Sequence, residues 1–227
     1  MVSNGYYLAP CAALFYALAA PLIAETVDCA NTQVRVENAG SDAALICRLV
    51  AEATDQLASC ALTVPEPLTI SIVPELEEYC LGIYHCGEGL IEILPRDAYS
   101  GRLRPEEAGA FHGVSTDAFY ASILRHELAH AALDSMPCPF GTCLVGQEYV
   151  AYTMQVRFLP EADRAIFEAA ALQDGPISRD ALNPIILMMA PDVFARRAWQ
   201  HLTERNDPCA FIGQIARAEV LLDYEHP

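Results

Sequence analysis

Lysine is absent from the sequence, and all 13 basic residues are arginines. The chain has 30 acidic residues, which gives a formal net charge of −17. A surface this acidic repels the phosphate backbone of nucleic acids and the anionic headgroups of lipids, so we expect no nucleic-acid partner. Hydrophobic residues make up 53% of the 227 residues. This composition excludes a disordered chain and is enough for one domain with a substantial core.

Charged side chains are also absent from residues 1–24. An apolar run from Leu8 to Ala24 ends in small residues, and the mature chain would begin near Ala20 or Glu25. This pattern is typical of a signal peptide over residues 1–24. The alternative is an uncleaved membrane anchor, but about 17 residues interrupted by proline are short for a membrane span. We expect an exported protein, periplasmic or extracellular, with no stable membrane insertion after cleavage.

A CxxC pair, the usual signature of a structural zinc knuckle, is absent although the chain has nine cysteines. Cys11 lies in the predicted signal peptide, which leaves an even set. An even set in an exported chain predicts disulfides, here up to four. Short spacing makes Cys80 with Cys86 and Cys138 with Cys143 the first candidate pairs. The others are Cys29, Cys47, Cys60 and Cys209. The sequence leaves their pairing open.

Segments that favour strands come first in the chain, and helices follow. Apolar alternation and β-branched residues predict strands at 34–37, 68–73 and 89–94, and a strand or loop at 80–86. Helical spacing predicts helices at 41–58, 116–133, 147–158, 161–172, 178–189, 192–203 and 208–222, with a surface loop at 96–114. The order predicts an α+β fold in one domain, residues 25–227. A mixed sheet lobe, 25–135, precedes a helical lobe, 136–227.

Two histidines stand four residues apart in the segment His126-Glu127-Leu128-Ala129-His130. Residues four apart share a helix face, so both imidazoles can reach one zinc ion at about 2.0–2.1 Å. Glu127 lies about 100° further round the helix and need not bind the metal. From there it can take a proton from a zinc-activated water and pass it to a leaving amine. The alternative is a helix that carries this pattern by chance.

A third ligand would complete such a site. A histidine six residues after the second one would indicate a metzincin, but that position is Met136. The first acidic residue beyond the following turn is Glu148, near the start of the next predicted helix. A turn closed by Cys138 and Cys143 can return this carboxylate to the imidazoles, which gives a His, His, Glu set plus water. His201, in a later helix, is an alternative ligand.

With His126, Glu127, His130 and Glu148 in this order, the chain resembles the gluzincins, and its size is similar to that of the minigluzincins. Its cysteine-containing turn also looks like that of a group of exported bacterial proteins. The resemblance covers the middle of the chain well, the N-terminal part loosely and the last fifty residues hardly at all. It implies a zincin-like fold, one Zn²⁺ per chain, and a metallopeptidase that hydrolyses a peptide or protein substrate. The alternative is a zinc-binding scaffold without catalysis, or a latent protein regulated by a partner.

The chain departs from the thermolysin type four residues after the glutamate ligand, where that type has an aspartate that orients a histidine. Here the position is Tyr152, which can make a hydrogen bond but carries no negative charge. The residues considered for orienting a ligand or stabilising an oxyanion are Tyr152, Tyr149, His112, Asp134, Asp117, His85 and Arg125. Each also has an ordinary interpretation, as a core tyrosine or as a residue of a loop, helix end or surface.

The substrate is expected to bind at a sheet edge. In zincins an extended peptide pairs with the edge strand above the active helix, through main-chain hydrogen bonds. Residues 89–94 are the candidate for this strand. The alternative is that they form an ordinary interior strand.

Overall fold

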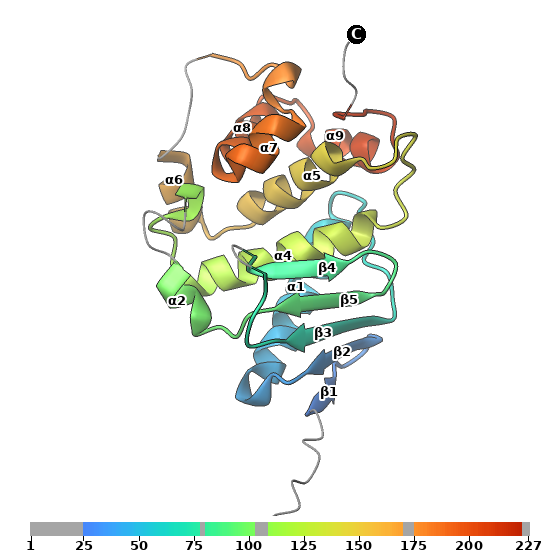
Figure 1. Ribbon diagram of the computed structural model, residues 1–227, viewed down its shortest axis with the longest axis vertical. Coiled ribbons are helices and arrows are strands. Elements are labelled where there is room, and N and C mark those ends of the chain that lie inside the picture. Colours follow the sequence, from blue (N-terminus) through green and yellow to red (C-terminus); the bar gives the residue numbers. More distant parts are fainter. Residues whose placement is uncertain (1–24, 78–79, 103–108, 170–174, 224–227) are drawn as a thin grey trace, which may run out of the picture.

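The computed structural model describes residues 25–77, 80–102, 109–169 and 175–223. The predicted signal peptide, residues 1–24, lies outside this part of the chain. Figure 1 shows a sheet with a helix against it, and a lobe of helices beyond. The predicted α+β class is therefore confirmed, and so is the order of an N-terminal sheet followed by a helical lobe.

Five strands form one mixed sheet in the described residues, in the order β1-β2-β3-β5-β4. They are β1 (Thr26–Asp28), β2 (Val34–Glu37), β3 (Leu68–Ile72), β4 (Gly82–His85) and β5 (Leu90–Ile93). The central strands β2, β3 and β5 run parallel, and β1 and β4 pair antiparallel at the two edges. The register places Val36, Ile70, Ile91 and Tyr84 in one row across the sheet. All four are buried, so this row forms the core face of the sheet.

The edge strand is β4 and not the predicted segment 89–94. That segment forms β5, which lies between β3 and β4, so the alternative of an interior strand is confirmed. The two strands form a hairpin, and β4 follows the long connection that leaves β3. Which strand of a hairpin joins the sheet depends on pairing with a distant strand, which the local pattern does not encode.

The helices mostly begin within three residues of the predicted starts, but the last one ends at Ala216, six residues before the predicted end. They are α1 (Ala43–Ala58), α2 (Ala98–Arg102), α4 (Thr116–Leu133), α5 (Leu144–Arg157), α6 (Glu161–Ala169), α7 (Pro184–Met189), α8 (Pro191–Thr203) and α9 (Pro208–Ala216), with short 3-10 turns η1 (Gly40–Asp42), η2 (Gly109–Phe111) and η3 (Arg179–Ala181). The prediction for 116–133 is confirmed. The prediction of a loop at 96–114 is wrong in part, because α2 and η2 lie there. The predicted helix 178–189 is divided into η3 and α7, and Pro184 opens α7 behind the capping side chain of Asn183.

Helix α4 lies at the centre of the molecule, between the sheet and the helical lobe (Figure 1). It contacts α1, β4 and β5 on one side and α5 on the other. Most of its residues are buried, including the polar residues Ser122, Arg125, His126 and Glu127. Ionisable side chains are rarely buried unless they are paired or bound to a metal, so this helix is where function is expected.

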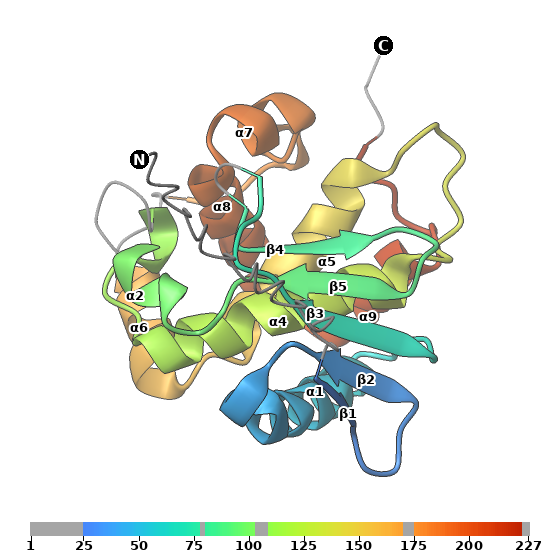
Figure 2. The same cartoon turned by 60° about the horizontal axis from the view of Figure 1, so that its bottom comes forward.

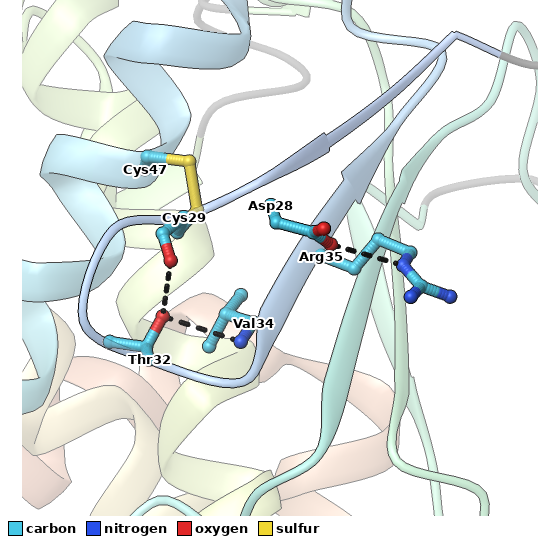
Figure 3. Close-up of a disulfide and its surroundings, with 6 residues drawn as sticks. All are labelled: Asp28, Cys29, Thr32, Val34, Arg35 and Cys47. Atoms are coloured by element: carbon cyan, nitrogen blue, oxygen red, sulfur yellow. Dashed lines mark hydrogen bonds and ion pairs between the residues drawn. A yellow bond between two sulfur atoms is a disulfide. The ribbon is translucent and has the colours of Figure 1, made fainter.

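Three disulfides join the described residues. Figure 3 shows Cys29–Cys47, which fixes the turn between β1 and β2 to α1; beside it, the Thr32 hydroxyl donates to the Cys29 carbonyl at 3.3 Å. The predicted pair Cys138–Cys143 is confirmed and closes the turn between α4 and α5. A third bond, Cys60–Cys209, joins the end of α1 to α9. Three disulfides indicate an oxidising environment such as that of an exported protein.

In the part of the chain that the structure describes, no helix is long and apolar enough to cross a membrane.

The predicted pair Cys80–Cys86 is wrong, and both thiols are free. The two residues flank β4, which is extended between them. The strand alone, from Gly82 to His85, covers about 10 Å. A disulfide needs its two Cα atoms within about 7 Å of each other. The short spacing suggested a closed loop, but the strand holds the cysteines apart.

Candidate metal centre

Three side chains converge from two helices: His126 and His130 on α4, and Glu148 on α5. The Nε2 atoms of the two histidines lie 3.1 Å apart. The Glu148 carboxylate spans both, with Oε2 at 3.5 Å from His126 Nε2 and Oε1 at 3.5 Å from His130 Nε2. Tetrahedral ligand atoms around an ion at about 2.0–2.1 Å lie about 3.3 Å apart. The group therefore has the spacing of a metal site.

The turn between α4 and α5 brings Glu148 back over the histidines. The Cys138–Cys143 disulfide closes this turn, as predicted. The start of α5 has a second anchor that the sequence did not reveal. The backbone N–H groups of Val145 and Gly146 donate to the Asp223 carboxylate at 2.7 and 3.0 Å. An anion at a helix N-terminus is stabilising, so Asp223 caps the helix that carries Glu148.

A chain of buried hydrogen bonds orients His126. The Gln155 Oε1 atom lies 3.1 Å from His126 Nδ1, and Gln155 Nε2 donates to the Ser122 hydroxyl at 3.1 Å. The Ser122 hydroxyl in turn donates to the Phe119 carbonyl at 2.7 Å. Because the amide nitrogen of Gln155 donates to Ser122, the atom of Gln155 that faces His126 is the oxygen, which is an acceptor. His126 therefore donates from Nδ1 and presents its Nε2 lone pair to the metal position. Gln155 has the role expected of an aspartate four residues after Glu148, but it lies seven residues after it, again on the same helix face.

Glu127 lies beside the metal group but is not part of it. Its carboxylate is held under β4, where it accepts a hydrogen bond from the Tyr84 backbone N–H. A Cβ atom at Gly82 would come within 2.8 Å of Glu127 Cγ, so the glycine leaves the room that this side chain occupies. Burial raises the pKa of Glu127 to about 7. A carboxyl group with such a pKa can both accept and release a proton near neutral pH.

Tyr152 is also at the site, one turn after Glu148 on α5. Its ring meets that of His126 edge to face, with centroids 4.7 Å apart. Burial and the nearby carboxylates of Glu148 and Glu127 raise the pKa of the Tyr152 hydroxyl. The hydroxyl therefore keeps its proton and is available as a hydrogen-bond donor in the cavity.

A cavity of about 490 Å³ opens over these residues. It lies beside β4, which Figure 2 shows as the strand of the sheet nearest to the helical lobe. Its walls come from β4, η2, α4, α5 and the start of α8, and apolar side chains such as Phe111, Phe119 and Ile123 line much of it. A cavity of this size suits a ligand that inserts one or two side chains. The polar groups that bind or react are gathered at one point of an otherwise apolar surface.

Some backbone N–H and C=O groups of β4 face this cavity and make no hydrogen bond to the neighbouring strand β5. Leu94 N–H donates to the Leu81 carbonyl, and the register alternates from there along the hairpin. In an antiparallel pair, every second residue turns its N–H and C=O away from the partner strand. Those residues are Gly82 and Tyr84, and the Tyr84 N–H does point to Glu127. The strand at which a peptide could pair with the sheet is therefore β4, and not its neighbour β5, which is formed by the predicted segment 89–94.

Several predicted site residues lie elsewhere. Tyr149 follows Glu148 by one residue and is therefore rotated by about 100° into the helical lobe. There its hydroxyl lies 2.9 Å from His201 Nδ1, so neither residue reaches the metal position and His201 is not a ligand. Asp134 accepts a hydrogen bond from Gly87 N–H at 3.0 Å and interacts with the Tyr84 hydroxyl, so it fixes the β4–β5 hairpin to α4.

The remaining candidates are outside the cavity as well. His112 is exposed after η2, His85 pairs with Glu92, Asp117 pairs with Arg96, and Arg125 faces α1. His112 and Asp117 follow the ordinary interpretation given to them, as a loop residue and a helix end, whereas His85 lies in β4 and Arg125 is buried. Gly82, Gln155 and Asp223 were missed, because their roles depend on contacts between distant segments. The one local signal was Gln155, a polar residue two turns beyond Glu148 on the same face.

The chain belongs to a family of unknown function (DUF6639), whose model matches residues 34–225. No curated protein and no solved structure shows significant similarity to it. The matched region contains the whole metal group, Glu127 and β4. Family membership therefore places the site within the shared domain, and its chemistry has to be inferred from the geometry.

Proposed function

We propose that the protein is an exported zinc-dependent peptidase. The observation that carries this is the convergence of His126, His130 and Glu148, with the Glu127 carboxylate beside them under a free strand edge. Two imidazoles and one carboxylate are the ligand set of catalytic zinc sites that keep an open position. A bound zinc ion would supply Lewis acidity, which activates a water molecule and polarises the scissile carbonyl.

The residues of this chain supply the proton transfers and the orientation. Glu127 acts as general base and then as general acid towards the leaving amine. Its contacts with Gly82 and the Tyr84 N–H hold the carboxylate in one position, so little reorganisation is needed. Tyr152, which keeps its proton, donates a hydrogen bond towards the oxygen that becomes negative.

The substrate is an extended peptide or protein segment. The outward groups of β4 that do not hold Glu127, namely the N–H and C=O of Gly82 and the C=O of Tyr84, pair with its main chain, and its side chains enter the apolar cavity. A strand edge pairs with the main chain, which is the same in every peptide. The edge therefore gives affinity, and the cavity gives selectivity among side chains. This arrangement favours a peptidase over a hydrolase of small esters.

Metal content and hydrolysis together test the proposal. The purified mature protein should hold about one zinc per chain, and His126→Ala should lose most of it. The wild-type protein should cut casein or a peptide library, and a chelator should stop the reaction. If the protein holds zinc but cuts no faster than Glu127→Ala, it is a zinc-binding scaffold. If His126→Ala binds as much zinc as the wild type, the site itself is misidentified.

Gly82→Ala is expected to reduce hydrolysis about tenfold and leave zinc content unchanged, because the new Cβ would displace Glu127 and not the ligands. The matched control is Gly101→Ala, where a Cβ meets no atom within 4 Å. Initial rates and metal content of the two variants are to be compared. Equal rates for both variants would show that the Glu127 position tolerates displacement and is not catalytic.

Gln155→Leu is expected to weaken zinc binding about 10- to 100-fold, because His126 then loses the acceptor that fixes its tautomer and ring orientation. Thr153→Val on the same helix is the control; this hydroxyl only donates to carbonyls of its own helix. Competition with a zinc-binding dye gives both affinities. An unchanged affinity in Gln155→Leu would mean that packing alone orients His126.

A further inference from the structure

A second cavity, of about 460 Å³, lies on the opposite face of α4 from the metal centre. Ala118, Ala121 and Arg125 line it, whereas Phe119, Ile123 and His126 line the first cavity, and the two cavities have no lining residue in common. Its other walls come from α1 and from the turn between α5 and α6, with Leu45, Leu49, Phe158 and Leu159 as apolar surface.

Arg125 is a buried cation in this cavity, and its hydrogen bonds and ring contact among the described residues are all with neutral groups. Only 6% of the residue is exposed. Its Nε donates to the Gln56 side-chain oxygen at 2.5 Å, its Nη1 donates to the Gln155 carbonyl at 3.5 Å, and its guanidinium lies over the Phe158 ring. Those partners are neutral, and among the described residues no carboxylate forms an ion pair with Arg125. Burial lowers the pKa of Arg125 to about 10, although the Glu52 carboxylate, which is paired with Arg48, raises it, and Arg125 stays charged at neutral pH.

The other charges around the cavity are balanced. Arg48 pairs with Glu52 at 2.8 Å, and Arg96 pairs with Asp117. Three arginines and two carboxylates line the cavity, so its wall carries a net charge of +1 in a chain whose net charge is −17. A buried charge is costly unless it is paired, and the missing partner is one negative charge.

We propose that this cavity binds a small organic monocarboxylate, with the carboxylate on Arg125 and an apolar body against Leu45, Leu49 and Phe158. The planar guanidinium matches a carboxylate, and the volume lies in the range of small-molecule sites. A single uncompensated positive charge favours a monoanion over a doubly charged phosphate. The carboxylate can be that of a free acid or the C-terminus of a peptide. The site is independent of zinc and of hydrolysis.

Calorimetric titration with phenylpropionate tests this, with the protein both metal-loaded and treated with chelator. We expect saturable binding in both states, about tenfold or more weakened by Arg125→Gln. The matched control is Arg157→Gln, since Arg157 also lies over Phe158 but does not line the cavity. Phenylpropionamide, which has no charge, and inorganic phosphate should bind at least about tenfold more weakly than phenylpropionate. Parallel titration with N-acetylphenylalanine shows whether a peptide C-terminus or a free acid is preferred.

A second variant keeps the test decisive if Arg125→Gln fails to fold. Ala121→Leu narrows the cavity and retains Arg125, and it should weaken binding, whereas Ala58→Leu on the exposed side of α1 should not. The proposal is overturned if no saturation occurs up to about 10 mM. It is also overturned if phosphate binds as tightly as the carboxylate, or if only chelation, and not the variants, abolishes binding, because the acid then sits on the metal.

Discussion

Glu127→Gln is expected to slow peptide hydrolysis about 100- to 10,000-fold and to leave one zinc per chain in place. Glutamine has nearly the same shape as glutamate, so it fits under β4 beside Gly82. It cannot take up a proton, so the general-base step is lost. Glu127 is outside the metal group, and the ligand distances among His126, His130 and Glu148 do not depend on it.

Glu92→Gln is the matched control for this prediction. Glu92 is a half-buried carboxylate on β5 that pairs with His85, outside the cavity. Single-turnover rates on a peptide cut by the wild-type protein, together with metal content, separate chemistry from binding. A Glu127→Gln variant that retains more than about a tenth of the wild-type rate would contradict the assigned role. A loss of zinc in this variant would instead place Glu127 among the ligands.

The part of the site that follows from local spacing was predictable. His126 and His130 are one turn apart on a helix, and any α-helix over 116–133 brings them to one face. Glu148 required a second step, a turn short enough to reverse the chain. Cys138 and Cys143 supplied that signal, and the disulfide is present. These three candidate ligands and Glu127 lie on two adjacent helices, so sequence reasoning could reach them.

The part of the site that depends on distant segments was not predictable. Gly82 lies opposite Glu127 only because β4 pairs with β5 at the sheet edge. Asp223 meets the start of α5 from the far end of the chain. A periodic pattern shows which face of an element is apolar, but it does not show which other element covers that face. The same limit explains why β5 was mistaken for the edge strand.

Helix α4 shows how a single element serves both sides of the molecule. One face carries His126 and His130 of the candidate metal group together with Glu127, and the opposite face carries Arg125. Gln155 contacts both, since its side chain holds His126 and its carbonyl accepts from Arg125. From the sequence Arg125 was one of the candidates for stabilising the oxyanion, and it is the neighbour of His126 in the chain. The rotation of about 100° per residue sends the two side chains to different cavities.

Removal of the Cys60–Cys209 disulfide is expected to have the largest effect on stability. The bond joins residues 149 apart, from the end of α1 to α9. In the chain-entropy account, closing a loop of that length restricts the unfolded chain by about 5 kcal/mol, against about 2 kcal/mol for Cys138–Cys143, whose cysteines are 5 apart. Among the disulfides of the described residues, only Cys138–Cys143 lies within the long loop. Nearly the full length of that loop therefore contributes to the loop entropy.

The double variant Cys60→Ala with Cys209→Ala should therefore lose about 4–5 kcal/mol in the free energy of unfolding, measured in urea without reductant. The double variant Cys138→Ala with Cys143→Ala should lose about 2 kcal/mol. For zinc content, the expected order of the two double variants is the reverse of that for stability. The short ring positions α5 and Glu148, so its loss should weaken zinc binding, whereas Cys60–Cys209 does not touch the cavity and its loss should not. Equal losses of stability in the two variants would contradict the loop-length argument, and loss of zinc in the first would show that α9 holds the site together.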